Sequence, residues 1–170
     1  MDQLLLFDID ATMITTGGSG MTAMKEAGQE LFGPGFKTDG INFAGRLDPL
    51  IISEMFKLSG VPHQPSQINE FRRVYAFKLA ERLEGNAKAR ALPGVAPLLR
   101  ALVAADAPCL GVLTGNFEET GSMKLRACGI DPGWFDVRVW GDDSPTHPPS
   151  RDQLPGVAIE RFRDAFGRPI

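Results

Sequence analysis

A short apolar run that ends in two acids is the feature that most constrains how this chain can fold. Residues 4–9 read Leu-Leu-Leu-Phe-Asp-Ile, and Asp10 follows at once. A continuous apolar stretch of this length is typical of a strand that is covered on both faces and carries polar groups only at its carboxyl end. We therefore expect a central parallel strand with Asp8 and Asp10 at its end.

The rest of the chain alternates between helical and strand patterns. Apolar residues recur at helical spacing in residues 21–32, 48–58, 66–83, 93–102, 117–128 and 155–166, whereas residues 109–113 and 135–140 read as strands. Strands that alternate with helices predict an α/β fold, with a parallel sheet whose carboxyl ends bind the ligand. The first three helical stretches follow one another without a strand and predict a small helical lobe.

Composition narrows the classes of partner. The chain has 170 residues, 43% of them hydrophobic, and a net charge of −3 with scattered basic residues, which argues against nucleic acid and anionic membranes and favours a small molecule. Cys109 and Cys128 lie in core-like segments, which indicates buried thiols in a reducing compartment. With neither a signal peptide nor a membrane-spanning run in view, we expect a cytoplasmic protein.

Polar residues follow the two strands from which the site is expected to form. Asp8 and Asp10 are separated by one residue, so their side chains point roughly the same way. Such a pair suits phosphoryl transfer, in which one carboxylate attacks phosphorus and the other moves a proton; the alternative is two solvent-facing acids at a strand end. Thr114, Gly115 and Asn116 follow residues 109–113 and are either part of the same site or an ordinary turn.

Three short segments resemble the haloacid-dehalogenase-like (HAD) superfamily. Residues 6–13 resemble its first motif, Asp-x-Asp-Gly-Thr, and residues 113–116 resemble its second, a Thr or Ser that ends a strand. Residues 141–143 with Arg151 are similar to the third-motif region of phosphoglycolate-phosphatase-like members. The resemblance covers nearly the whole chain. It implies a Rossmann-like core formed by residues 1–17 and 92–170, with residues 18–91 inserted as a helical cap.

The resemblance also implies roles for single residues. Asp8 would be the nucleophile that forms an aspartyl-phosphate, Asp10 would be the general acid and base, and both would bind Mg²⁺. Thr114 would hydrogen-bond a phosphoryl oxygen. Backbone N–H groups would complete an anion cradle near Ile9, Ala11, Gly115 and Asn116.

The third motif normally supplies a Lys, and none follows Asp143. Arg151 is the candidate cation, because its planar fork can bridge carboxylate and phosphate oxygens; the alternative is a solvated residue before the last helix. Lys124 is the rival, but it lies about two helical turns beyond Thr114, so we expect it on the surface. In the cap, Arg46 either meets a distal anionic group of the substrate or is exposed beside a helix that Asp48 caps.

The sequence departs from the family pattern at two places. Ala11 replaces the usual Gly, and its methyl group is harmless unless the position needs a positive φ. The acids of a fourth motif, which help to bind Mg²⁺, are not found before Ile170, so we expect a truncated chain with an incomplete metal site and an exposed first strand prone to self-association. Asp142 and Asp143 would stand two strand spacings, about 10 Å, from Asp8.

The sequence therefore predicts an origin in a Mg²⁺-dependent HAD phosphatase acting on a small phosphorylated metabolite, with low activity of the chain as it stands. The alternative is a noncatalytic protein that keeps the phosphate cradle without turnover. Dehalogenation is a weaker alternative, because a halide leaving group needs no acid such as Asp10.

Overall fold

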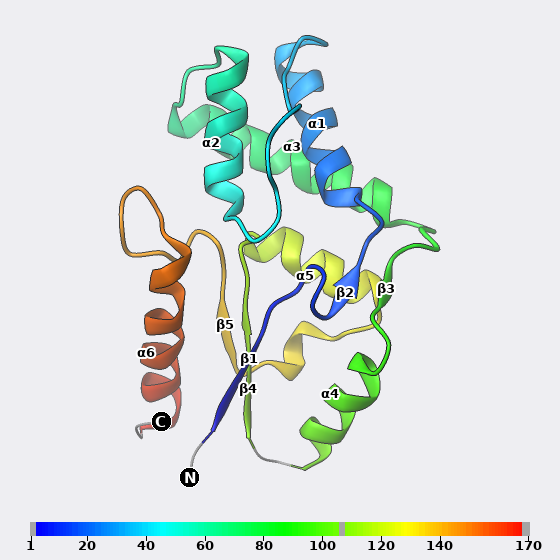
Figure 1. Cartoon of the computed structure of the whole chain (residues 1–170), viewed down its shortest axis with the longest axis vertical. Coiled ribbons are helices and arrows are strands. Elements are labelled where there is room, and N and C mark those ends of the chain that lie inside the picture. Colours follow the sequence, from blue (N-terminus) through cyan, green and yellow to red (C-terminus); the bar gives the residue numbers. More distant parts are fainter. Residues whose placement is uncertain (1–2, 106–107, 168–170) are drawn as a thin grey trace.

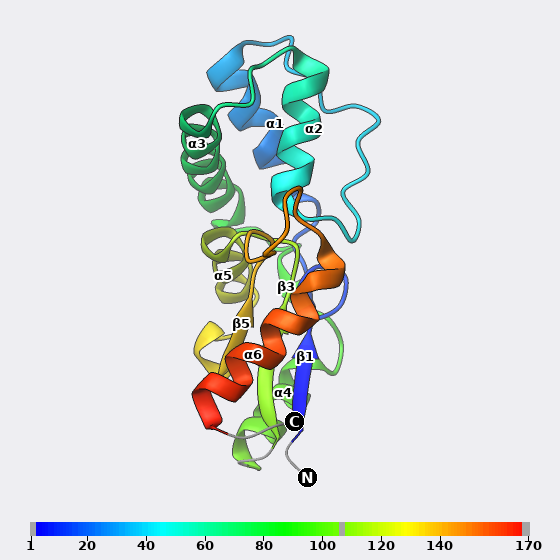
Figure 2. The same cartoon turned by 90° about the vertical axis from the view of Figure 1, so that its left-hand side faces the viewer.

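The computed structural model describes residues 3–105 and 108–167 and shows an α/β core beneath a lobe of helices (Figure 1). Strands β1 (Leu4–Phe7), β4 (Cys109–Leu113) and β5 (Val137–Val139) form a parallel sheet in the order β1-β4-β5. The predicted α/β class with a parallel sheet is confirmed. Their carboxyl ends point toward the helical lobe, as Figure 2 shows from the side.

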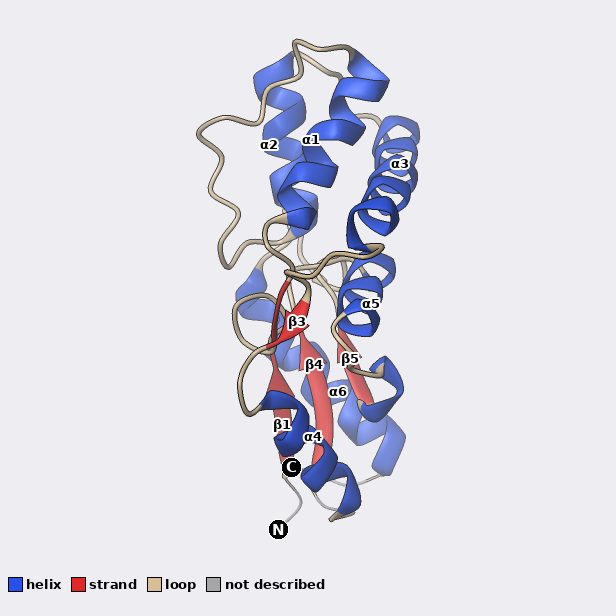
Figure 3. Cartoon of the chain, turned by 90° about the vertical axis from the view of Figure 1, so that its right-hand side faces the viewer, coloured by secondary structure: helices blue, strands red, loops and turns tan. Residues whose placement is uncertain are grey.

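Helices cover both faces of the sheet (Figures 1 and 3). One face packs against α6 (Leu154–Phe166), and the other packs against α4 (Val95–Ala104) and α5 (Glu118–Ala127). Side chains alternate along β5 and β4 as expected of strands. Val137 and Val139 lie in one cluster with Phe162 of α6, whereas Leu110 and Val112 lie in the cluster on the opposite face. The sheet is therefore the centre of a three-layer core.

The lobe consists of three helices, α1 (Ser19–Phe32), α2 (Asp48–Ser59) and α3 (Pro65–Leu83), around a cluster of aromatic rings. The ring centroids of Phe56 and Phe71 are 5.5 Å apart, and Phe36 lies against both. A Cβ atom at Gly28 would come within 2.1 Å of the Phe36 ring, so the absence of a side chain there lets the ring reach the cluster. The lobe thus has a core of its own.

Two short strands connect the lobe to the core. Strand β2 (Ile14–Thr15) pairs antiparallel with β3 (Arg90–Ala91) where the chain leaves the core and where it returns. The sequence did not predict this pair, because two-residue strands show no periodicity. Two 3₁₀ turns, at Pro132–Trp134 and Arg151–Gln153, complete the regular elements of the described chain.

Strand β1 is shorter than the apolar run suggested. The chain turns after Phe7, since the N–H groups of Met13 and Ile14 both donate to the carbonyl of Ile9. Within the described residues β1 has a strand neighbour on one side, and Leu6 is 38% exposed. Residues 168–170, at the end of the chain before which no fourth motif was found, lie outside the described residues.

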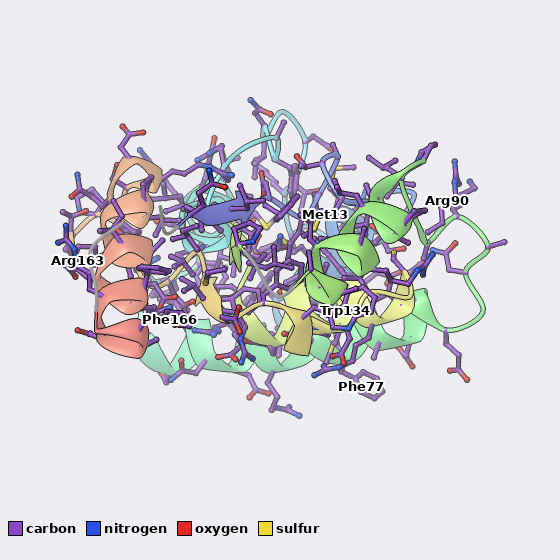
Figure 4. All side chains as sticks on the ribbon, turned by 90° about the horizontal axis from the view of Figure 1, so that it is seen from below. Met13, Phe77, Arg90, Trp134, Arg163 and Phe166 are labelled. Carbon is purple, nitrogen blue, oxygen red and sulfur yellow. The ribbon has the colours of Figure 1, made fainter. Side chains whose placement is uncertain are left out.

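The exposed side chains, the cysteines and the helix lengths describe the rest of the molecule. Phe77 projects outward from α3 and is 58% exposed (Figure 4), but single exposed apolar residues are common on protein surfaces. Neither Cys109 nor Cys128 is in a disulfide; Cys128 is buried, as predicted, and Cys109 is only partly so. No helix in residues 3–105 and 108–167 is long and apolar enough to cross a membrane.

Candidate active site

Asp8 lies just beyond β1, and both of its carboxylate oxygens accept hydrogen bonds. Oδ1 accepts from the N–H of Ile9 at 2.8 Å, and Oδ2 accepts from Nη2 of Arg151 at 2.7 Å. The two side chains are about one-third exposed, 32% for Asp8 and 31% for Arg151, so the pair remains open to a ligand. Arg151 begins the 3₁₀ turn before α6, and its guanidinium reaches the end of β1. Its placement agrees with the predicted role, which no observation tests.

Lys124 is at the site as well, and the expectation that it lies on the surface is wrong. Its side chain is 7% exposed, and Nζ lies 2.8 Å from Oδ2 of Asp10 and 2.6 Å from Oδ1 of Asn116. The rise along a helix placed Lys124 too far away, but helical side chains lean toward the helix N-terminus, and lysine has a long stem. The ammonium group therefore reaches back along α5 to the strand ends.

Glycines make room for this lysine. A Cβ atom at Gly121, on the same face of α5, would come within 2.8 Å of the Trp140 ring, so its absence lets the helix lie close to the sheet. A Cβ atom at Gly20 would come within 3.2 Å of Nζ of Lys124. One signal was present in the sequence: Lys124 falls on the stripe of α5 that also carries Gly121, Leu125 and Cys128, where a solvated lysine is out of place.

Thr114 and Asn116 belong to the same hydrogen-bond network. Nδ2 of Asn116 donates to Oδ2 of Asp10 and to Oγ1 of Thr114, both at 2.8 Å. The N–H of Thr114 donates to the carbonyl of Val139 at 3.1 Å, which fixes the end of β4 against β5. Thr114 and Asn116 are buried, with 1% and 5% exposed. The loop after β4 thus holds Asp10 in place through Asn116.

Most of the backbone N–H groups expected to cradle an anion already have partners. The N–H of Ile9 donates to Asp8, that of Ala11 to the carbonyl of Ile14 at 3.0 Å, and that of Asn116 to Oγ1 of Thr114 at 3.4 Å. A bound phosphoryl group would have to compete with these bonds. Their role as a cradle stays a prediction.

Ala11 has φ of 59°, so the backbone at this position does adopt the left-handed conformation. The Cβ atom of an L-residue in that region costs about 1–2 kcal/mol relative to an ordinary conformation. The residue is exposed, so its methyl group meets no buried neighbour. The departure from glycine therefore introduces local strain beside Asp10.

The helical lobe, which is the predicted cap, approaches position 115 so closely that only glycine fits there. A Cβ atom there would lie 2.0 Å from the carbonyl oxygen of Arg46, which belongs to the loop before α2. The side chain of Arg46 contacts neighbouring residues of the cap: Nη1 donates to Glu54 of α2 at 2.5 Å and to the carbonyl of Asn42 at 3.2 Å. The predicted contact of Gly115 with a ligand stays a prediction.

Asp48 is a buried carboxyl that the sequence did not single out as functional. It does not cap α2, whose N-cap is Leu47; instead Oδ2 accepts from the N–H of Phe117 at 3.3 Å, and its own N–H donates to the carbonyl of Gly115 at 2.7 Å. Burial raises the pKa of Asp48 to about 7, against the lowering effect of Lys124 nearby. Asp48 thus ties the cap to the loop after β4.

These groups surround a cavity of about 610 Å³ between core and cap. The core contributes Asp8, Asp10, Thr114, Lys124 and Arg151, and the cap contributes residues of α1, of the loop before α2, of α2 and of α3. A cavity of this size suits a small molecule.

Comparison with known proteins gives the fold. No family model and no curated protein matches the sequence, but solved structures match most of it. CbbY from Rhodobacter sphaeroides in complex with phosphate is 21% identical, with a TM-score of 0.74 over 95% of this chain and 73% of that one. A hydrolase from Pseudomonas syringae (20%, TM-score 0.62, covering 100% and 73%) and a predicted phosphoglycolate phosphatase from Haemophilus somnus 129pt (20%, 0.57, 85% and 65%) match as well. The chain has the HAD-like fold.

Within the HAD-like fold the acids after β5 are engaged elsewhere. Asp142 accepts from Nη1 of Arg72 on α3 at 2.9 Å, and Asp143 forms a two-pronged pair with Arg161 of α6 at 2.6 Å for each contact. Neither residue lines the cavity that contains Asp8. Among the described residues no three His, Cys, Asp or Glu side chains are grouped so as to hold a metal ion.

Proposed function

We propose that this chain is a phosphohydrolase that acts on a small phosphomonoester through an aspartyl-phosphate. The observation that carries the proposal is the pair of carboxylates in one cap-covered cavity, each next to its own cation: Asp8 beside Arg151 and Asp10 beside Lys124. The chain shares its fold with CbbY, which has been solved with phosphate, and with a predicted phosphoglycolate phosphatase. That likeness supports phosphate ester chemistry in general and is silent on the substrate.

The two carboxylates have different tasks in the proposed reaction. Asp8 attacks phosphorus, so a bond forms between its carboxylate oxygen and phosphorus while the bond to the leaving oxygen breaks. Asp10 gives its proton to that leaving oxygen and later takes a proton from the water that hydrolyses the aspartyl-phosphate. Arg151 offsets the charge of the nucleophile and the phosphoryl group, and Lys124 with Asn116 fixes the orientation of Asp10.

We further propose that Mg²⁺ is the cofactor and that Asp8 and Asp10 hold it. Mg²⁺ is commonly bound by one or two carboxylates, with the remaining positions taken by substrate phosphate and water, and two carboxylates on one cavity wall fit that donor set. When bound, the ion reduces the repulsion between an anionic nucleophile and an anionic phosphate. Since no three acids of the described residues are grouped so as to hold a metal ion, substrate oxygens and water would supply more of the ligands.

The test is phosphate release by the whole chain with Mg²⁺, compared with the Asp8→Asn variant. The amide has the same shape and cannot act as the nucleophile, so turnover should fall at least about a thousandfold while the fold persists. Asp164→Asn, the same change on an exposed part of α6, is the matched control and should leave turnover unchanged. Comparable turnover by Asp8→Asn would refute the assignment. Binding of inorganic phosphate without hydrolysis by the parent would favour the noncatalytic alternative.

A further inference from the structure

The cavity has two unlike ends. At the core end stand the carboxylates and the cations Arg151 and Lys124, close to the carboxyl ends of β1 and β4. The cap supplies mostly apolar surface, from Met21 and Met24 of α1, Phe43 of the following loop and Ile51 of α2. A substrate whose phosphate lies at the core end therefore places its organic part against apolar side chains.

The cap also brings a cation to the cavity, but that cation is already neutralised. Arg46 lines the cavity, and its guanidinium donates to the carboxylate of Glu54, one turn and a half into α2, at 2.5 Å. The other two lining cations among the described residues, Lys124 and Arg151, are paired with Asp10 and Asp8. Asp48 adds a further buried carboxyl to the wall. A second anionic group on the substrate would thus meet no unpaired positive charge at the cap end.

We infer that the site selects phosphomonoesters with an apolar organic part and disfavours substrates that carry a second phosphate or carboxylate. The inference rests on the proposed function for the position of the phosphate, and it adds Glu54 as the residue that sets specificity by neutralising Arg46. Transfer of one methylene from water to an apolar wall should raise affinity about threefold to fourfold. A charge moved from water into a cavity without a counter-charge is strongly disfavoured.

Alkylphosphonates test this without any need for turnover, because they cannot be hydrolysed. Isothermal titration of the whole chain, with Mg²⁺ present, would compare ethyl-, butyl- and hexylphosphonate with butane-1,4-bisphosphonate. Affinity should rise about threefold per methylene, and the bisphosphonate should bind at least tenfold more weakly than butylphosphonate. Affinity that does not depend on chain length, tighter binding of the bisphosphonate, or no binding at all would overturn the inference. If the phosphonates rank as expected but phosphomonoesters are not hydrolysed, the proposed function fails and the inference about binding stands.

Two variants localise the effect. Glu54→Gln keeps the shape of the side chain and leaves Arg46 with its charge, so the ratio of bisphosphonate to butylphosphonate affinity should rise at least tenfold. Glu70→Gln is the matched control, since Glu70 forms the same kind of pair with Arg73 on the exposed surface of α3, and the ratio should not change. Met21→Gln, at a half-exposed cavity position, should reduce the gain per methylene. An unchanged ratio in Glu54→Gln would refute the role given to Glu54.

Discussion

Asp48 offers a quantitative test of how cap and core are joined. The residue is 6% exposed, its carboxylate accepts one hydrogen bond from the N–H of Phe117, and burial raises its pKa to about 7 from an ordinary 3.8. The perturbation is Asp48→Asn, which keeps the oxygen that accepts this bond and removes the titration. The free energy of unfolding of parent and variant is then compared as a function of pH.

The sign of the pH dependence of stability follows from the difference in bound protons between the folded and the unfolded chain. Because the pKa of Asp48 is higher in the folded chain than in the unfolded one, the folded chain binds more protons between about pH 4 and 7. The contribution of this group to stability is therefore complete below pH 4 and is lost as the pH rises through 7. At ~1.36 kcal/mol for each pH unit between the two pKa values, the loss is on the order of 4 kcal/mol.

Urea unfolding between pH 4 and pH 8.5 measures this difference. Other ionisable groups titrate equally in parent and variant, so Asp48→Asn should gain up to about 4 kcal/mol relative to the parent as the pH rises. The exposed Asp164→Asn should show no such trend. A stability difference that is independent of pH would show that Asp48 ionises normally, and the burial argument would then be wrong.

Three further substitutions have defined outcomes. Ala11→Gly should raise the free energy of unfolding by up to about 1 kcal/mol, because relief of the left-handed strain exceeds the added freedom of the unfolded chain; urea unfolding checks it. Lys124→Met should cost about 1–3 kcal/mol in the same assay, because Oδ1 of Asn116 loses its donor, and it should lower phosphate release. Leu6→Lys should suppress any self-association seen by light scattering, because a charge on the edge strand β1 opposes pairing with another chain.

The elements of the core could be predicted because each is encoded locally. Residues 109–113 are five apolar or small residues that follow Pro108 and precede the polar Thr114, and the strand has these bounds in the structure. The helices after it begin and end within a residue or two of the predicted ranges, since their apolar spacing is continuous. Strand β1 ended earlier than predicted because its last residues combine apolar character with a turn, and the turn depends on hydrogen bonds to the carbonyl of Ile9 that composition does not reveal.

The cations of the site could not be predicted with equal success. Arg151 was assigned by residue type and lies against Asp8, whereas Lys124 was dismissed by a distance along the helix axis. That estimate used the rise of the backbone and ignored the length and direction of the side chain. The position of Lys124 also depends on the approach of α5 to Trp140, which the glycine at 121 permits and which involves residues far apart in sequence.

One loop, residues 114–116, contacts both the cap and Asp10. Residues 114–116 hold Asp10 through Asn116 on the core side, and on the cap side the carbonyl of Gly115 accepts the N–H of Asp48. The close approach of Arg46 leaves no space for a side chain at position 115, so the loop cannot shift toward the cap without a clash. A displacement of α2 therefore acts first on the loop that orients Asp10, and only through it on the acid. The loop that contacts both Asp48 of the cap and Asp10 of the core thus links the position of α2 to the orientation of Asp10.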